Sequence, residues 1–156
     1  MVDLPVLDFS VKSSIHDYKV EFINNPNETL KSILNDTDVI IIDKKVHSLY
    51  PDLFDESKVN YIPIKANETQ KSYECLGTII EKLINGSFKK NHRLIAIGGG
   101  IIQDITAFIA SIMYRGVDWL FFPTTLLAQG DSCIGSKTSI NYKDYKNQLG
   151  GFYPPN

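Results

Sequence analysis

Two groups of residues in the second half of the chain have the types and spacing of a ligand site. Gly98, Gly99 and Gly100 follow an apolar run at 94–97 and come directly before a helical pattern. Glycine lets the backbone turn sharply and lets a ligand approach the main chain, and free N–H groups at a helix start favour a phosphate. Residues 123–147 then form a run rich in hydroxyl, amide and ammonium groups. The combination predicts an anionic, oxygen-rich ligand.

The glycine turn differs from the two common nucleotide-binding motifs. The dinucleotide fingerprint G-x-G-x-x-G needs a glycine at position 103, where Gln103 stands. The P-loop pattern comes within one residue over 130–138, but Ser136 occupies the place of its lysine. A strand-to-helix turn that binds no ligand therefore stays open as an alternative.

Several candidate positions also have a reading that needs no ligand. Asp104 lies in the first turn of the helix after the glycines, where a carboxylate either complements the helix dipole or holds a ligand hydroxyl. Arg115 follows that helix, and a lone arginine at a helix end is usually solvated. Thr124 and Thr125 either cap a short helix or hold a cofactor amide or ribose.

The sequence contains no persuasive metal site. His16, His47 and His92 are isolated from one another and from carboxylates at ligand spacing. The two cysteines, Cys75 and Cys133, make neither a disulfide framework nor a cysteine-based zinc site, which favours a reducing cytoplasm. Cys133 is interpreted as a small packing residue.

Composition favours one folded domain without affinity for polyanions or membranes. The chain has 156 residues, of which 43% are hydrophobic and 22% charged, enough for a packed core. Its net charge of -2 gives no reason to expect nucleic acid or a membrane surface as a partner. The N-terminus lacks the pattern of a signal peptide, and the apolar segments are too short to span a membrane. A cytoplasmic protein is therefore expected.

Hydrophobic patterns predict a Rossmann-like α/β fold. A β-hairpin is expected over 7–12 and 18–22, followed by strands at 39–42, 59–64 and 94–97 and a strand that ends at Pro123. Helices are expected over 27–34 (capped by Asn27), 46–54, 67–83, 101–113 and 124–129. This alternation indicates a mostly parallel sheet with helices on both faces. Ligands of such sheets bind at the carboxyl ends of the strands, where Asp43, the 65–68 segment and the glycines would share one edge.

The motif series after residue 94 resembles the N-terminal domain of 3-dehydroquinate synthases and, more broadly, of the sugar phosphate cyclases. The matching pieces, in order, are GGGxxxD at 98–104, Arg115-Gly116, PTTLLAQxDS at 123–132, GxKTxxN at 135–141, and Lys146-Asn147. Upstream the resemblance is thinner and consists of Asp43, Glu68 and Lys71. On this resemblance, residues 1–156 are an NAD-binding α/β domain.

The resemblance implies a role for each matching residue. The NAD-binding residues would be Asp43, Glu68, Lys71, Gly99, Gly100, Ile101, Asp104, Thr124, Thr125, Leu127, Asp131 and Lys146. Lys137 and Asn147 would bind the substrate, with Asp131 nearby. Arg115 would reach the substrate phosphate of a neighbouring subunit, because family members are dimers.

The resemblance also implies the reaction. Family enzymes convert a heptulosonate 7-phosphate into 3-dehydroquinate and phosphate, a step of the shikimate pathway to aromatic amino acids. NAD is regenerated in each turnover, and a divalent metal, zinc or cobalt, acts as a Lewis acid. The metal ligands of the family come from a helical C-terminal domain that this chain does not contain. The domain alone is therefore expected to be inactive.

Two departures from the family pattern leave the substrate open. Ser136 stands where dehydroquinate synthases usually have a second glycine before the lysine, and Ala66-Asn67 replaces the usual Asp-Gly before Glu68. A sugar phosphate cyclase that makes a different carbocycle is therefore one alternative. A module that binds a nucleotide or phosphate without catalysis is the other.

Overall fold

The computed structural model describes residues 7–51 and 60–156. Its strands are β1 (Phe9–Val11), β2 (Tyr18–Val20), β3 (Val39–Asp43), β4 (Asn60–Ile64), β5 (Leu94–Gly98), β6 (Trp119–Pro123), β7 (Lys137–Tyr142) and β8 (Tyr145–Phe152). Its α-helices are α1 (Pro26–Ile33), α2 (Lys44–Leu49), α3 (Tyr73–Asn85), α4 (Gly100–Ile112) and α5 (Leu126–Gly130), and the 3-10 turns are η2 (Met113–Arg115) and η3 (Ser132–Ile134). The predicted α/β fold is confirmed.

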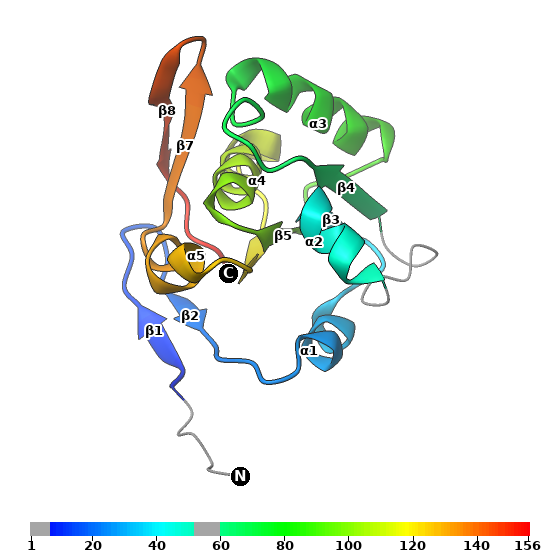
Figure 1. The fold of residues 1–156 in the computed structure, drawn as a ribbon, viewed down its shortest axis with the longest axis vertical. Coiled ribbons are helices and arrows are strands. Elements are labelled where there is room, and N and C mark those ends of the chain that lie inside the picture. The colour runs from blue at the N-terminus through cyan, green and yellow to red at the C-terminus, as the bar shows by residue number, and fades with distance from the viewer. Residues whose placement is uncertain (1–6, 52–59) are drawn as a thin grey trace.

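A parallel sheet of order β4-β3-β5-β6 forms the centre of the molecule. Side chains alternate along β3, so Val39 and Ile41 point to one face while Ile40 and Ile42 point to the other. The first face packs against α3 and α4, and the second packs against α1. Figure 1 shows these helices on opposite sides of the sheet. The central strands β3 and β5 are therefore buried between two layers, which explains their continuous apolar runs.

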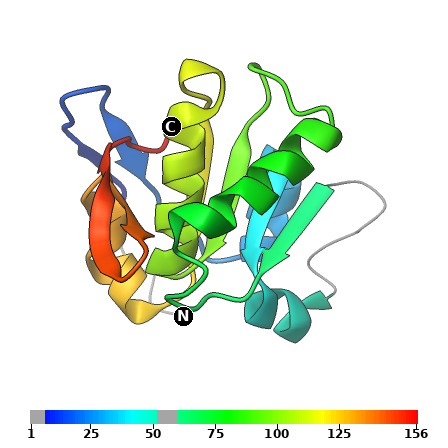
Figure 2. The same cartoon turned by 90° about the horizontal axis from the view of Figure 1, so that it is seen from above.

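The helix α4 is the most deeply enclosed helix of this core. Its buried residues, on several sides of the helix, are Ile102, Gln103, Ile105, Thr106, Ala107, Ile109 and Ala110. One flank contacts β5 and β6, and the other contacts β7. The hairpin β7–β8 lies along α4, on the opposite side of the molecule from β4 (Figures 1 and 2).

The helices α1 and α3 have other N-terminal caps than expected. Asn25, not Asn27, caps α1, because Pro26 fits the first helical position and the Asn25 side chain accepts the N–H of Glu28. The helix predicted over 67–83 begins only at Tyr73, capped by Ser72. Asn67 accepts the N–H of Gln70 and closes a separate turn before it. Glu68 and Lys71 therefore lie on a loop.

The hairpin β7–β8 was not predicted, and one predicted helix is shorter. Polar residues dominate 137–147, so the sequence shows no strand alternation there. Since β7 packs on α4, the strands are nevertheless part of the fold. The helix predicted over 46–54 is observed as α2, and its residues 52–54, like the first residue of the strand predicted over 59–64, lie outside the described residues.

Candidate functional site

A cavity of about 250 Å³ opens beside the first turn of α4. The glycine turn, the connection after α5 and the strand β7 supply its walls, which include Gly100, Asp104, Asp131, Lys137 and Ser139. Four of these five residues are candidates named from the sequence. The fold thus brings the glycine turn and the polar run to one place, at the carboxyl end of β5.

The three glycines differ in the space available for a Cβ atom. A Cβ atom on Gly98 would lie 2.5 Å from Ile102 Cγ1, and one on Gly99 would lie 3.0 Å from Thr125 Cγ2. A Cβ atom on Gly100 would meet nothing closer than the Ser132 hydroxyl at 3.8 Å. Packing therefore leaves no room for a Cβ atom at Gly98 and little room at Gly99, whereas at Gly100 the open space belongs to the cavity.

The start of α4 offers unpaired backbone donors to this cavity. The N–H groups of Gly100, Ile101 and Ile102 precede the first intrahelical hydrogen bond, which runs from Gln103 N to Gly99 O. Within the described part of the chain, no side chain caps this helix. The donors and the positive end of the helix dipole fit an anionic group such as a pyrophosphate.

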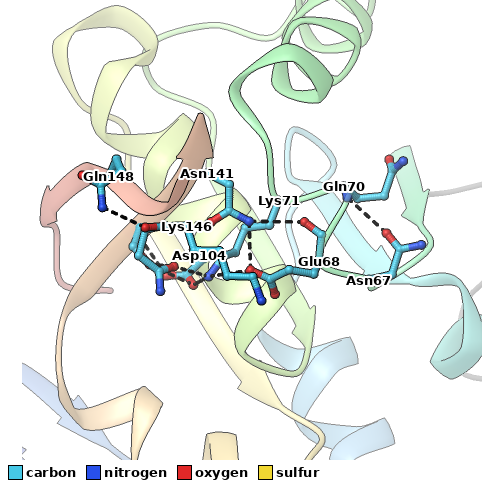
Figure 3. A network of polar contacts seen from close by, with 10 residues as sticks. Asn67, Glu68, Gln70, Lys71, Asp104, Asn141, Lys146 and Gln148 are labelled. Carbon is cyan, nitrogen blue, oxygen red and sulfur yellow. Dashed lines mark hydrogen bonds and ion pairs between the residues drawn. The ribbon is translucent and has the colours of Figure 1, made fainter. Parts of the chain in front are cut away.

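The side chain of Asp104 is the centre of a polar network on the α4–β7 side of the cavity (Figure 3). Its Oδ2 atom accepts from Lys71 Nζ at 3.0 Å, and its Oδ1 atom accepts from Ser139 N at 2.9 Å. Lys71 is only 7% exposed and also donates to Asn147 Oδ1 at 2.7 Å. One ammonium group thus joins a predicted cofactor residue, Asp104, to a predicted substrate residue, Asn147.

Burial governs the ionisation of Asp104. Loss of solvent raises the pKa of its carboxyl above the ordinary value, while the hydrogen bond and charge of Lys71 and the hydrogen bonds from Ser139 lower it in part. Ionisation of the Asp104 carboxyl therefore costs free energy in the folded state, and Lys71 offsets part of this cost.

The strand β8 departs from regular pairing beside this network. Ile140 pairs with Leu149 and Tyr142 pairs with Tyr145, so three residues of β8 face the single residue Asn141. Asn147 lies in the middle of these three and has a left-handed backbone with φ of 55°. A bulge of this kind re-aims a side chain, and here the Asn147 amide oxygen meets Lys71 and Ser139.

The threonines after β6 lie beside the glycine turn. Thr124 N donates to Gly98 O at 2.9 Å, and Thr125 caps α5 by accepting the N–H of Ala128. Leu127 is 73% exposed on that helix, and Asp131 ends it at the cavity. The capping interpretation of Thr125 is therefore correct, and its position against Gly99 also leaves a ligand contact open.

The remaining candidates are less closely gathered. Asp43 follows the Ile42–Ile97 pair, so it flanks Gly98, but its carboxylate accepts the N–H of Lys45 as the cap of α2. Lys146 is exposed on the β8 bulge near the network (Figure 3). Arg115 is exposed at the far end of α4, about 20 Å from the glycines at 1.5 Å per helical residue. Arg115 does not reach the cavity of its own chain.

Sequence reasoning assigned no site role to three side chains that organise the site. Ser139 donates to Asp104 and Asn147, and Gln103 donates to the carbonyl of Ser132 and so holds the α5–β7 connection against α4. Asn141 is 5% exposed and connects two segments of the network. A buried amide in an apolar helix was a readable signal at Gln103, whereas Ser139 and Asn141 depend on the unpredicted hairpin.

The described residues contain no group of three or more His, Cys, Asp or Glu side chains that could hold a metal ion. Over the same residues, no helix is long and apolar enough to cross a bilayer. Burial raises the pKa of the Cys133 thiol, which lowers its reactivity as a nucleophile.

Comparison with known proteins relates the chain to one family. The family model for the 3-dehydroquinate synthase N-terminal domain matches residues 61–156. A 3-dehydroquinate synthase of Streptococcus equi subsp. equi (strain 4047) is 36% identical over 154 residues, which cover 94% of this chain and 43% of the relative. The chain thus spans less than half the length of this curated relative.

Two solved structures are similar in fold. A 2-deoxy-scyllo-inosose synthase complexed with carbaglucose-6-phosphate, NAD+ and Co2+ matches with a TM-score of 0.79 and 22% identity, over 95% of this chain and 44% of that one. A 2-epi-5-epi-valiolone synthase from Streptomyces hygroscopicus subsp. jinggangensis 5008, with NAD+ and Zn2+ bound, matches with a TM-score of 0.68 and 30% identity, over 76% of this chain and 35% of that one.

Proposed function

Since the chain belongs to the 3-dehydroquinate synthase N-terminal family, among the sugar phosphate cyclases, we propose that it binds NAD and supplies the cofactor side of a carbocycle-forming active site. The observation that carries the proposal is the start of α4. There the uncapped amides of residues 100–102 and the open space at Gly100 border the cavity. An anionic diphosphate fits these donors.

The substrate we propose is a heptulosonate 7-phosphate, converted to 3-dehydroquinate and phosphate in aromatic amino acid biosynthesis. The relatives named as 3-dehydroquinate synthases support this choice. Ser136 has a left-handed backbone with φ of 52°, so its conformation is one that favours glycine. The departure from the usual glycine therefore concerns backbone strain, and it gives little support to the alternative of a different carbocycle.

NAD would supply transient oxidation of a ring hydroxyl by accepting a hydride, and the chain's own residues would bind and orient. Lys137 lines the cavity, and its ammonium group is suited to an anionic substrate oxygen. Asn147 presents an amide in the Asp104 network, with its orientation held by Lys71 and Ser139. Asp131, at the end of α5, adds a carboxylate to the cavity lining that is suited to a hydroxyl donor.

The partners and setting follow as further proposals. A zinc or cobalt ion would need ligands from outside the described residues. Arg115 lies far from its own cavity, so its predicted contact with a substrate phosphate requires a homodimer in which the cavity of the neighbouring subunit receives it. We propose a cytoplasmic enzyme with these partners.

Calorimetry with NAD tests the proposal through Gly100→Ala. The added methyl group has space in the empty cavity, so the free energy of unfolding should change little, while the group would stand where a ligand approaches the backbone. We expect at least a tenfold loss of NAD affinity. Gly77→Ala is the matched control, because Gly77 lies on α3 with nothing within 4 Å of its Cβ position. Equal NAD affinity in wild type and Gly100→Ala would contradict the proposed position of the pyrophosphate.

A non-catalytic binding module is the alternative, and substrate turnover separates the two. Restored to a longer chain that carries the metal-binding domain, the protein should release phosphate from a heptulosonate 7-phosphate. Lys137→Ala should abolish that turnover and leave NAD affinity largely intact, because Lys137 lies on β7 rather than at the helix start. A joint loss of both in a folded variant would contradict the role assigned to Lys137.

A further inference from the structure

We propose that Asn141 is a positioning residue that aims Asn147 into the site and couples it to Glu68. Asn141 carries none of the roles assigned above, yet it is 5% exposed in the strand next to the cavity. The inference deepens the proposed function, on which it rests only for the ligands that Glu68 and Asn147 contact.

The amide of Asn141 spans two segments of the site. Its Nδ2 atom donates to Glu68 Oε1 at 2.8 Å, and its Oδ1 atom accepts from Asn147 N at 2.8 Å. Figure 3 shows the Asn141 side chain directed toward Glu68. A carboxylate accepts but does not donate. Glu68 therefore fixes which end of the amide faces Asn147, and only the oxygen end can accept the Asn147 N–H group.

The main chain of Asn141 is held as firmly as its side chain. Its N–H group donates to Lys71 O at 2.9 Å, in a bridge between Asn141 and Ser72 that lies outside the sheets. Asn141 is therefore bound to the loop that carries Glu68 and Lys71, although it belongs to β7.

The bulge explains why Asn147 needs a side chain to hold it. Three residues of β8 face Asn141 alone, so the strand ladder offers Asn147 N no ordinary partner there. The Asn141 side chain accepts this N–H group in place of the ladder. With the backbone so held at φ of 55°, the Asn147 side chain meets Lys71 and Ser139. Glu68 thereby acts on Asn147 without touching it.

Hydrogen exchange of the Asn147 amide, measured by NMR, tests this coupling. In Glu68→Ala the Asn141 Nδ2 atom loses its 2.8 Å hydrogen bond to the carboxylate and keeps only the longer one, 3.4 Å, to the Glu68 carbonyl. We expect Asn147 exchange to rise about fivefold, the equivalent of one hydrogen bond. In Glu68→Gln the side-chain oxygen still accepts from Asn141, so exchange should stay near the wild-type rate. The Tyr153 amide, which donates to Ser136 O at the other end of the hairpin, is the internal control.

A reversal of donor and acceptor distinguishes positioning from a merely structural role. Asn141→Asp places a carboxylate against Glu68 and should raise Asn147 exchange at least fivefold through repulsion. In the double variant Asn141→Asp with Glu68→Gln, the glutamine donates to the new carboxylate, which still accepts from Asn147, so the rate should return to within about twofold of wild type. NAD affinity should stay low in the double variant, because the Glu68 carboxylate is absent.

Two results would overturn the proposal. The first is an unchanged rate of Asn147 exchange in Glu68→Ala. This result decides the question even if Asn141→Asp does not fold. The second is absence of rescue in the double variant while Tyr153 exchange is normal. Failure of the wild-type chain to bind NAD would count against the proposed function, whereas the exchange rates decide the role of Asn141 independently.

Discussion

The two walls of the cavity are built by opposite means. At the glycine turn the main chain itself faces the ligand space, and the fit of Gly98 against Ile102 sets its shape. On the α4–β7 side Asp104 lines the cavity, and behind it the Lys71 ammonium group donates hydrogen bonds to both Asp104 and Asn147. The stability of a steric fit does not vary with pH, whereas a buried network of charges is stable only while each of its partners is present. The first wall suits a constant cofactor group, and the second suits contacts that must be oriented.

Removal of the Lys71 ammonium group should have the largest effect. Lys71→Met leaves the Asp104 carboxylate buried without its cation, and loss of one partner of a buried pair costs about 3 kcal/mol in the free energy of unfolding. Urea unfolding at pH 8 measures this. Lys71→Met with Asp104→Asn removes both charges and should recover most of the loss. Equal stability of Lys71→Met and wild type would show that Lys71 does not stabilise the Asp104 carboxylate. The proposed difference between the two walls would then be wrong.

A methyl group at the glycine turn should cost less free energy of unfolding than the loss of Lys71, and this cost should not depend on pH. Gly98→Ala brings its Cβ atom to 2.5 Å from Ile102 Cγ1, and overpacking of this kind costs about 1–3 kcal/mol. Gly77→Ala, an exposed helix position with open space, should instead stabilise by about 0.5–1 kcal/mol. The loss at Gly98 should be the same at pH 5 and pH 8. A pH-dependent loss would mean that the turn is coupled to the charged wall.

The backbone-built wall was the part that the sequence could predict. Continuous apolar runs and three glycines before a helix identify β5, α4 and the strand edge, because strand burial and helix starts leave local patterns. The partners of Asp104 left no such pattern. Lys71 lies 33 positions from Asp104 and Asn147 lies 76 positions from Lys71. Their contact depends on a polar hairpin whose strands are stabilised by packing on α4.

Loss of the N-terminal cap of α5 should lower the free energy of unfolding by a moderate amount. Thr125→Ala removes the hydroxyl that accepts the Ala128 N–H group, which costs about 1 kcal/mol. Thr125→Ser keeps the hydroxyl and is the matched control; it should lose less. Urea unfolding compares the two. If both variants lost the same amount, the Thr125 methyl group against Gly99, rather than the cap, would be the stabilising contact.

The smallest effect is a difference in pH dependence that arises from Asp104. Burial raises the pKa of this carboxyl above 3.8, so between that value and the raised pKa the folded state binds more protons than the unfolded state. Stability contributed by Asp104 therefore falls as pH rises through this window and is constant above it. Asp104→Asn does not titrate, so the free energy of unfolding of wild type minus that of Asp104→Asn should decrease from pH 4 upward and then level off. Every other carboxylate is common to the two proteins, so the difference isolates one group. An increase with pH would show that Lys71 and Ser139 outweigh burial. The ionised Asp104 carboxylate would then stabilise the folded state, and the two walls would differ only in their geometry.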